Sequence, residues 1–199
     1  MKLYKFECKK CAKCCKEKKL VVTITHRDVL RIYYGLKLET VDELLKYVAF
    51  FGVDINNQEL LERLMYPSFI LNDSYYVLGL NKENNTVCSF LENNICSIYK
   101  FRPKICRIFP FTFKEKNNRL TIQINELANK ICPGLNNNAP LVIIKELKEL
   151  WKQIITEKKE YEKLISLWNK LVSNKLLDST PKTFLNFILG NIGIQSKIT

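Results

Sequence analysis

The order of apolar and polar positions predicts three regions that differ in secondary structure. Residues 1–66 combine a short apolar run at 20–24, which predicts a strand, with apolar residues at helical spacing, the last of them at 58–65. Residues 67–135 alternate between apolar and polar positions, as half-buried antiparallel strands do. After Pro140 the apolar residues return to three- and four-residue steps. The pattern therefore predicts an α+β fold.

Capping residues mark the helix boundaries in the first region. Thr25 is a suitable N-cap for a helix that Gly35 ends. Thr40 and Glu43 form a capping box ahead of a second apolar stretch, which we expect to continue as a helix until Gly52. The sequence thus predicts at least two capped helices before the β-rich region.

Antiparallel hairpins are predicted in the middle region. A strand is expected at residues 75–78. The apolar runs 87–91 and 95–99 flank a short polar turn and are expected to pair with each other. A second hairpin is expected around residues 117–118. Its alternating apolar side chains should belong to the core, and they are Phe109, Phe111, Phe113, Leu120, Ile122 and Ile124.

Helices dominate the last region. An amphipathic pattern from Ile144 to Val172 predicts a long helix, with an interruption expected at the charged run 157–160. Thr180-Pro181 then suits the start of a last helix, which Gly190 ends. This region contains no cysteine, so we expect it to serve packing or partner binding.

Eight cysteines carry the candidate chemistry. They are Cys8, Cys11, Cys14, Cys15, Cys88, Cys96, Cys106 and Cys132. A Cys-x-x-Cys spacing lets one turn of backbone direct two sulfurs at one point, as a metal ion or an iron–sulfur cluster requires. In a reducing cytosol, thiols with this spacing are metal ligands more often than disulfides. All eight are therefore candidate metal ligands.

The spacing favours an iron–sulfur cluster over zinc without deciding between them. Four-iron clusters often use three cysteines at Cys-x-x-Cys-x-x-Cys and a distant fourth that proline follows. Cys8, Cys11 and Cys14 have the first feature, and Cys132-Pro133 has the second. The other four sulfurs would then be spare, and eight sulfurs also divide into two four-cysteine sites. A 4Fe–4S cluster and zinc both stay open.

Composition and hydropathy place the chain among folded proteins of the cytoplasm. Apolar residues make up 47% of the chain, which is typical of a folded protein. We find neither a secretory signal nor an apolar run of about 18 residues that would span a membrane. We expect residues 1–138 to form a cysteine-cluster metal-binding domain, with residues 139–199 as a C-terminal helical extension packed on it.

The charge of the chain bears on both the thiols and the partners. The formal net charge is +12, and eight lysines fall within residues 1–20. Neighbouring positive charge lowers the pKa of cysteine and favours the thiolate that binds metal. The basic excess also leaves binding to RNA or to an acidic protein open. A zinc-stapled RNA- or protein-binding module is therefore one alternative function.

These motifs resemble the CxxCxxCC family of YkgJ-type cysteine-cluster proteins, a family with eight characteristic cysteines that is described as chelating zinc or iron. The resemblance rests on residues 6–15, on the Cys-Ser-Phe-Leu and Cys-Ser-Ile-Tyr elements, on the Arg-Pro-Lys-Ile-Cys-Arg-Ile-Phe-Pro-Phe stretch, and on Cys132-Pro133-Gly134. Ala12-Lys13 departs from the family, which often has glycine before the double cysteine. The resemblance implies a metal or iron–sulfur site on all eight cysteines, with no agreed activity.

One branch of that family, the flagellin lysine N-methylases, combines the cluster with S-adenosylmethionine chemistry. A protein lysine or RNA methylase is therefore a further alternative, and whether the chain is an enzyme stays uncertain. The sequence has six glycines and no glycine-rich loop that would bind such a cofactor. We expect a metal-cluster-binding protein as the leading function.

Other residues have simpler interpretations. His26, the only histidine, is expected to be solvated at the start of a helix. Cys88 and Cys96 could also be buried strand cysteines without a ligand role. A cysteine nucleophile would depend on His26 as its base, so we do not favour nucleophilic catalysis.

Overall fold

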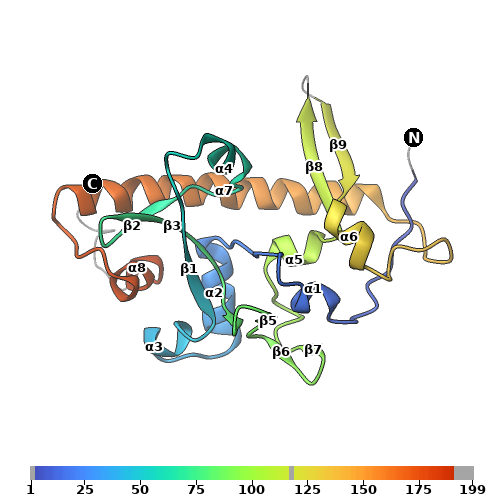
Figure 1. Cartoon of the computed structure of the whole chain (residues 1–199), viewed down its shortest axis with the longest axis horizontal. Helices are drawn as coiled ribbons and strands as arrows, with labels where there is room; N and C mark the ends of the chain where they lie inside the picture. The colour runs from blue at the N-terminus through green and yellow to red at the C-terminus, as the bar shows by residue number, and fades with distance from the viewer. Residues whose placement is uncertain (1–2, 117–118, 191–199) are drawn as a thin grey trace.

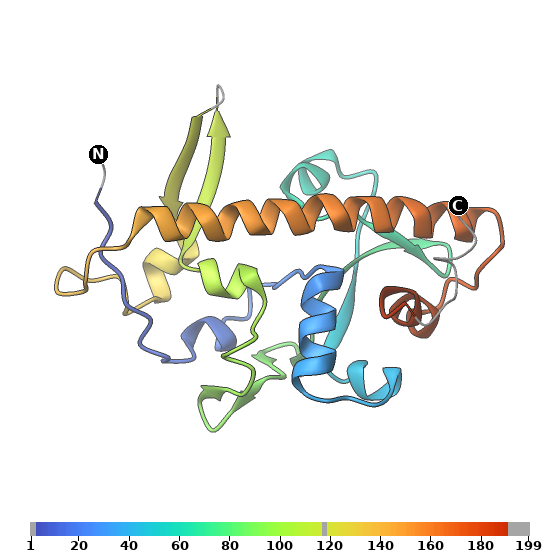
Figure 2. The same ribbon diagram turned by 180° about the vertical axis from the view of Figure 1, so that it is seen from behind.

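The computed structural model describes residues 3–116 and 119–190, so the turn predicted at 117–118 lies outside the described residues. It contains helices and antiparallel strand pairs, which confirms the α+β prediction. The longest element, helix α7 (Ile144–Ser173), runs along the length of the molecule (Figure 1). Most of the other elements lie along one side of α7, as the view from behind also shows (Figure 2).

A three-stranded antiparallel sheet packs against α7. In spatial order it consists of β1 (Val48–Gly52), β3 (Ser74–Leu80) and β2 (Phe69–Leu71). Strand β2 contacts α7, where the indole N–H of Trp168 donates to the carbonyl of Ile70 at 2.8 Å. The strand predicted at 75–78 is confirmed as part of β3. The hydrophobic core lies between this sheet, α7 and three of the four short helices described next.

Four short helices begin where the sequence predicts them, three of them behind a predicted capping residue. They are α2 (His26–Gly35), α3 (Val41–Leu44), α4 (Gln58–Arg63) and α8 (Pro181–Ile188). Thr25 and Thr40 each form a capping box with the carboxylate three residues later. Thr180 caps α8, with proline in its first turn. The predicted start of each capped helix is therefore confirmed.

The second predicted helix is wrong beyond Leu44, because residues 48–52 form strand β1 instead. In β1 the ring of Phe50 contacts the rings of Phe69 and Phe184, with centroids 6.2 and 6.3 Å away. Pairing with β3 thus lets this segment place an aromatic side chain against the core. Tertiary packing outweighs the local helical pattern here.

The strand predicted at residues 20–24 is also wrong. It is reduced to one bridge between Thr23 and Gly79, with a 2.9 Å hydrogen bond on each side. An added Cβ at Gly79 would lie 2.9 Å from the carbonyl oxygen of Val22 and 2.6 Å from the ring of Phe51. Glycine therefore permits the close approach of this segment to β3.

Two short ribbons follow the sheet. They pair β4 (Lys82–Glu83) with β5 (Val87–Cys88), and β6 (Leu91–Glu92) with β7 (Ile95–Cys96). The predicted turn between β6 and β7 is confirmed, and Asn93 and Asn94 adopt φ values of 48° and 61° there. The predicted partner of residues 87–88 is wrong, because Asn84 and Asn85 make an equally tight turn back to β4.

The second predicted hairpin is confirmed and projects from the body of the molecule (Figure 1). It consists of β8 (Phe111–Lys116) and β9 (Arg119–Ile124), and Phe113 lies opposite Ile122. The ring of Phe113 stacks on that of Trp151, with centroids 4.8 Å apart. This contact anchors the base of the hairpin to α7.

Helix α7 is continuous, so the interruption predicted at 157–160 is wrong. Its buried residues are Ile154, Tyr161, Ile165 and Trp168. Two carboxylates of the charged run have basic partners on α2, since Glu157 pairs with Arg31 and Glu160 with Arg27. Ion pairs with α2 thus stabilise the charged run within the continuous helix. Within the described ranges, no helix combines the length and the apolar character needed to cross a membrane.

His26 is buried, so the prediction that it is solvated is wrong. Its side chain stacks on Tyr161 of α7, with ring planes 7° apart and centroids 5.8 Å apart. Only 8% of the residue is exposed. Burial lowers the pKa of His26 to about 4, and the neighbouring Arg27 acts in the same direction.

Candidate metal centre

All eight cysteines line one cavity of about 200 Å³. Its walls include residues of the three short helices α1 (Lys13–Lys16), α5 (Lys104–Ile108) and α6 (Glu126–Ile131), and Figure 1 shows α1 between α6 and the β6–β7 ribbon. The lining thiols are those of Cys8, Cys11, Cys14, Cys15, Cys88, Cys96, Cys106 and Cys132. All eight are free, without disulfides. The structure therefore brings every candidate ligand to one place.

Backbone hydrogen bonds join the N-terminal segment to the loop after α6. The N–H of Glu7 donates to the carbonyl of Gly134 at 3.1 Å, and the N–H of Phe6 donates to the carbonyl of Pro140 at 3.0 Å. An added Cβ at Gly134 would overlap the carbonyl oxygen of Glu7, so only glycine permits this approach. These bonds hold the backbone next to Cys8 beside the turn that follows Cys132.

Helix α1 carries the adjacent residues Cys14 and Cys15. The preceding Ala12 is buried and has a φ of 59°, and its carbonyl accepts a 2.9 Å hydrogen bond from the N–H of Cys15. Helix α1 contacts both β5, which carries Cys88, and α6, whose C-cap is Cys132. This one turn of helix therefore connects two parts of the cavity.

The cavity has a deep side and an open side. Cys88, Cys96 and Cys106 come from β5, β7 and α5, and all three pack against the main hydrophobic core. Cys8 and Cys11 are exposed, whereas the other six cysteines are partly buried. Apolar side chains fill much of the remaining wall, among them Phe6, Phe90, Ile98, Phe109 and Phe111.

Burial makes most of these thiols hard to ionise on their own. It raises the pKa of Cys88, Cys96, Cys106 and Cys132. Cys14 differs, because a hydrogen bond from Cys15 lowers the pKa of Cys14 to about 6 and raises that of Cys15. A metal ion bound here must displace the thiol protons, so its affinity rises with pH.

Arg102 places positive charge at the cavity wall. Its guanidinium carbon lies 4.0 Å from the ring centroid of Tyr99. Its Nε atom is buried and has no hydrogen-bond partner among the described residues. Burial raises the pKa of Cys96 and Cys106, and the charge of Arg102 opposes that rise. The positive charge of Arg102 can therefore offset part of the negative charge of thiolates in the cavity.

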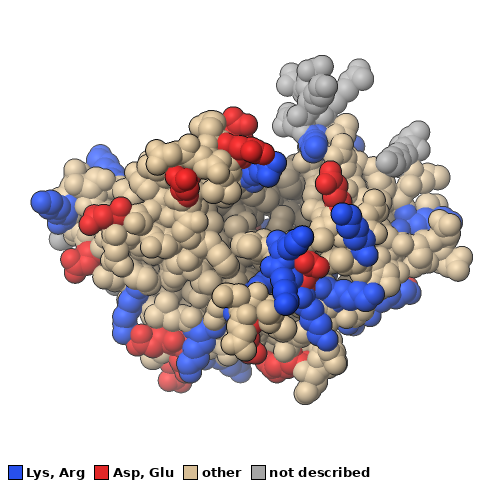
Figure 3. All heavy atoms as spheres, viewed as in Figure 1, with Lys and Arg blue, Asp and Glu red and all other residues tan. Residues whose placement is uncertain are grey.

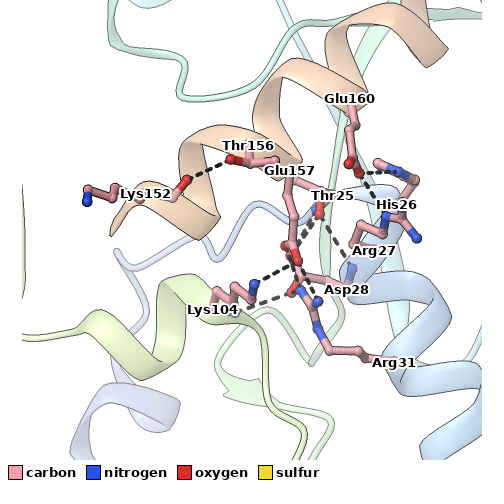
Figure 4. A network of polar contacts seen from close by, with 10 residues as sticks. All are labelled: Thr25, His26, Arg27, Asp28, Arg31, Lys104, Lys152, Thr156, Glu157 and Glu160. Carbon is pink, nitrogen blue, oxygen red and sulfur yellow. Dashed lines mark hydrogen bonds and ion pairs between the residues drawn. The ribbon is translucent and has the colours of Figure 1, made fainter. Parts of the chain in front are cut away.

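Sequence reasoning missed the polar network that holds α5 against α2 and α7 (Figure 4). Arg31 donates to both carboxylate oxygens of Glu157 at 2.7 and 2.8 Å, and to Asp28 at 2.5 Å. Lys104 of α5 lies 2.9 Å from Glu157 through its ammonium, and its backbone N–H donates to Asp28 at 3.3 Å. Because α5 also carries Cys106, this network fixes the helix behind one candidate ligand.

Two properties of the network explain why it was missed. Asp28 is only 1% exposed, yet in the sequence it has an ordinary capping role at the start of α2. Its partners come from distant segments, so no local pattern marks them. Hydrogen bonds from Arg31 and Lys104 lower the pKa of Glu157, although burial alone would raise it. Tyr99 and Lys82, which also line the cavity, were missed as well.

The chemistry of the donor set fits zinc or iron, since both metals bind thiolate sulfur. In the described part of the chain, no three Cys, His, Asp or Glu side chains are already arranged as they would be around a metal ion. The sulfurs line a common cavity and would have to close on a shared point. Thiolates repel one another without a cation between them, so that closure requires the metal.

The chain belongs to the CxxCxxCC family, whose model matches residues 7–138 and is described as a "putative zinc- or iron-chelating domain". The matched segment contains all eight cysteines. The chain is also similar to "Uncharacterized protein MJ0661" of Methanocaldococcus jannaschii, with 30% identity over 132 residues, or 65% of this chain. It spans 58% of that relative's length. No solved structure matches the chain. The family inferred from the motifs is thus confirmed, and it supports binding of zinc or iron.

Proposed function

We propose that this protein holds an iron–sulfur centre through its cysteine thiols, with Cys8, Cys11, Cys14, Cys15, Cys88, Cys96, Cys106 and Cys132 as the ligands. The observation that carries the proposal is that all eight free thiols line one cavity, although they are spread over more than half of the chain. Structural cysteines used as small hydrophobic residues have no reason to converge in this way.

Two features favour iron–sulfur chemistry over zinc. The Cys-x-x-Cys-x-x-Cys spacing of residues 8–14 and the Cys132-Pro133 pair, which suit a four-iron cluster, lie near each other because Glu7 is bonded to Gly134. The wall is mostly apolar, and burial and hydrogen bonds to sulfur are the means by which proteins tune such clusters. Zinc is the alternative that the same donor set allows.

The residues of this chain have distinct parts in the proposed site. The thiols bind the metal, the apolar wall excludes water, and Arg102 offsets the negative charge of a metal–thiolate centre. Such a centre would place negative charge beside Arg102, whose buried Nε atom has no hydrogen-bond partner among the described residues. When bound, an iron–sulfur cluster supplies one-electron transfer, whereas zinc supplies a redox-inactive crosslink.

The proposal is tested by purifying the full chain without oxygen and measuring iron, zinc, acid-labile sulfide and the visible spectrum on one sample. We expect iron and sulfide in similar amounts, with a broad thiolate-to-iron absorption. Zinc without sulfide would select the alternative metal. A folded protein that contains neither metal would refute the proposal.

We place the protein in the cytoplasm, where free thiols stay reduced and available for metal. A methylase that uses S-adenosylmethionine and a module that binds RNA or an acidic protein stay alternatives from the sequence. Neither gains support from the family match, so the metal centre is the function that the observations favour.

A further inference from the structure

We infer that the cavity holds two adjacent metal centres, each bound by four cysteines. The outer centre would use Cys8, Cys11, Cys14 and Cys132, and the inner centre Cys15, Cys88, Cys96 and Cys106. This inference rests on the proposed function and goes beyond it by assigning each sulfur to one centre.

The outer group is defined by the clamp between the N-terminal segment and the loop after α6. The Glu7–Gly134 hydrogen bond of 3.1 Å brings the start of the Cys-x-x-Cys-x-x-Cys run to the turn that follows Cys132. Cys132 also lies near enough to Cys11 and Cys14 for their charges to act on it. The exposed Cys8 and Cys11 make this the open side of the cavity.

The inner group is defined by packing on the hydrophobic core. Cys88, Cys96 and Cys106 all contact the main core cluster, to which the other five cysteines, Cys15 included, do not contribute. Helix α1 contacts β5, so Cys15 is close to Cys88. The charges of Cys88 and Cys96 act on Cys15. The charge of Cys14 acts on Cys88, Cys96 and Cys106, so Cys14 borders the inner group as well. These four are the sulfurs that a single cluster with ferredoxin-like spacing would leave unused.

Helix α1 explains why the adjacent Cys14 and Cys15 belong to different groups. The two thiols are hydrogen-bonded to each other, so their sulfurs are neighbours, and the elements that α1 contacts on either side assign each sulfur to a group. The helix contacts α6, which leads to Cys132, and also β5, which carries Cys88. Cys14 and Cys15 are thus placed where the two groups meet.

The number of sulfurs matches the number of ligands that two four-cysteine centres need. One tetrahedral ion or one four-iron cluster takes four thiolates. A single centre would leave four further thiols in a partly buried and mostly apolar cavity, without a disulfide between any of them. A second four-thiolate centre would use these remaining sulfurs as ligands.

Double variants of the full chain test this assignment, with Co²⁺ as the probe because its thiolate complexes absorb visible light. The metal-free, reduced protein is titrated with Co²⁺ in the presence of a chelator that removes incompletely ligated ions. Cys11→Ala/Cys132→Ala removes two outer ligands, and Cys88→Ala/Cys96→Ala removes two inner ligands. Cys11→Ala/Cys96→Ala removes one ligand from each group. Thr112→Val, at a residue that lines the same cavity without a sulfur, is the control.

We expect the wild type and the Thr112→Val control to retain two ions, each same-group variant to retain one, and the cross-group variant to retain none. Equal retention in the three double variants would overturn the assignment, as would a wild type that binds one ion only. Binding of no Co²⁺ by the folded wild type would instead refute the proposed function. Because each same-group variant is expected to keep one intact centre, loss of both ions in those variants also contradicts the inference.

Discussion

The backbone N–H of Glu7 donates a 3.1 Å hydrogen bond to the carbonyl of Gly134, which closes a loop of more than 120 residues at the edge of the cysteine cavity. The first and last of the eight cysteines lie next to this contact in the sequence. Glycine is needed at position 134 because any side chain would overlap the carbonyl of Glu7. The contact thus connects backbone geometry directly to the candidate metal centre.

Gly134→Ala should separate these two segments. The added methyl group forces the backbone apart, and we expect a loss of about 1–3 kcal/mol in the free energy of unfolding. Metal binding should weaken as well, because Cys8 and Cys132 move away from each other. Urea unfolding and metal titration measure the two effects.

Gly52→Ala is the matched control, since the nearest atom to an added Cβ there is 4.0 Å away, on the ring of Tyr76. This change should leave metal binding unaltered and shift stability by less than about 0.5 kcal/mol. Equal effects of the two substitutions would show that the Glu7–Gly134 approach is not essential.

Removing Arg31 should destabilise the protein strongly. Arg31→Gln leaves the carboxylates of Asp28 and Glu157 without their main cation, and these groups are 2% and 12% exposed. Breaking a buried ion pair in this way costs about 3–5 kcal/mol, and Lys104 can offset part of that cost. The free energy of unfolding in urea is the quantity to measure.

Arg63→Gln provides the comparison, because Arg63 and Glu59 form an equally short pair of 2.5 Å with side chains 75% exposed. Loss of such an exposed pair should change stability by no more than about 0.5 kcal/mol. If both arginine variants unfold at the same urea concentration, the network in Figure 4 does not stabilise the fold as we argue.

Acid should destabilise the protein partly through His26. Its pKa is about 4 in the folded protein against an ordinary value of 6.5, so the folded state binds fewer protons than the unfolded state in that interval. The stability that the neutral side chain contributes is complete above pH 6.5 and is lost as the pH falls towards about 4. Arg27 and Arg31 oppose protonation of His26, whereas Glu157 and Glu160 favour it, and burial decides the direction.

His26→Phe isolates this contribution because phenylalanine preserves the stacking on Tyr161 without a titratable group. We expect the variant to lose less stability than the wild type between pH 6.5 and pH 4. Parallel stability curves for the two proteins would show that His26 does not titrate between the folded and unfolded states.

Arg102→Gln should weaken metal binding without unfolding the protein. Groups that support metal ligands from behind typically contribute about 10- to 100-fold in affinity. Arg102 is such a group, since it opposes the effect of burial on Cys96 and Cys106. Arg107→Gln removes an exposed guanidinium from the neighbouring helix and should leave the affinity unchanged. Competition titrations with a chelator distinguish the two variants, and equal affinities would exclude this role for Arg102.

The parts of the fold that depend on local chemistry could be predicted from the sequence. Thr25, Thr40 and Thr180 each cap a helix as expected, because an N-cap acts within its own first turn. The β8–β9 register follows from alternating apolar residues on both strands. The cysteines could be singled out because close spacing of sulfur has few explanations other than metal binding.

The parts that depend on distant partners could not be predicted in this way. The sequence predicts a helix at residues 48–52. They form a strand instead, because Phe50 packs against Phe69 and Phe184. His26 is buried only because α7 covers it, and the division of the chain into two domains stays a prediction. The assignment of sulfurs to separate centres likewise needed the packing of α1 against β5 and α6.

Counting reactive thiols tests the central claim most directly. The protein, isolated with its metal under anaerobic conditions, is treated with a thiol reagent before and after a chelator and denaturant remove the metal. We predict that the cysteines are protected in the metal-bound protein and that all eight react once the metal is gone. Equal reactivity in both states would show that the sulfurs do not bind metal, even though they line one cavity.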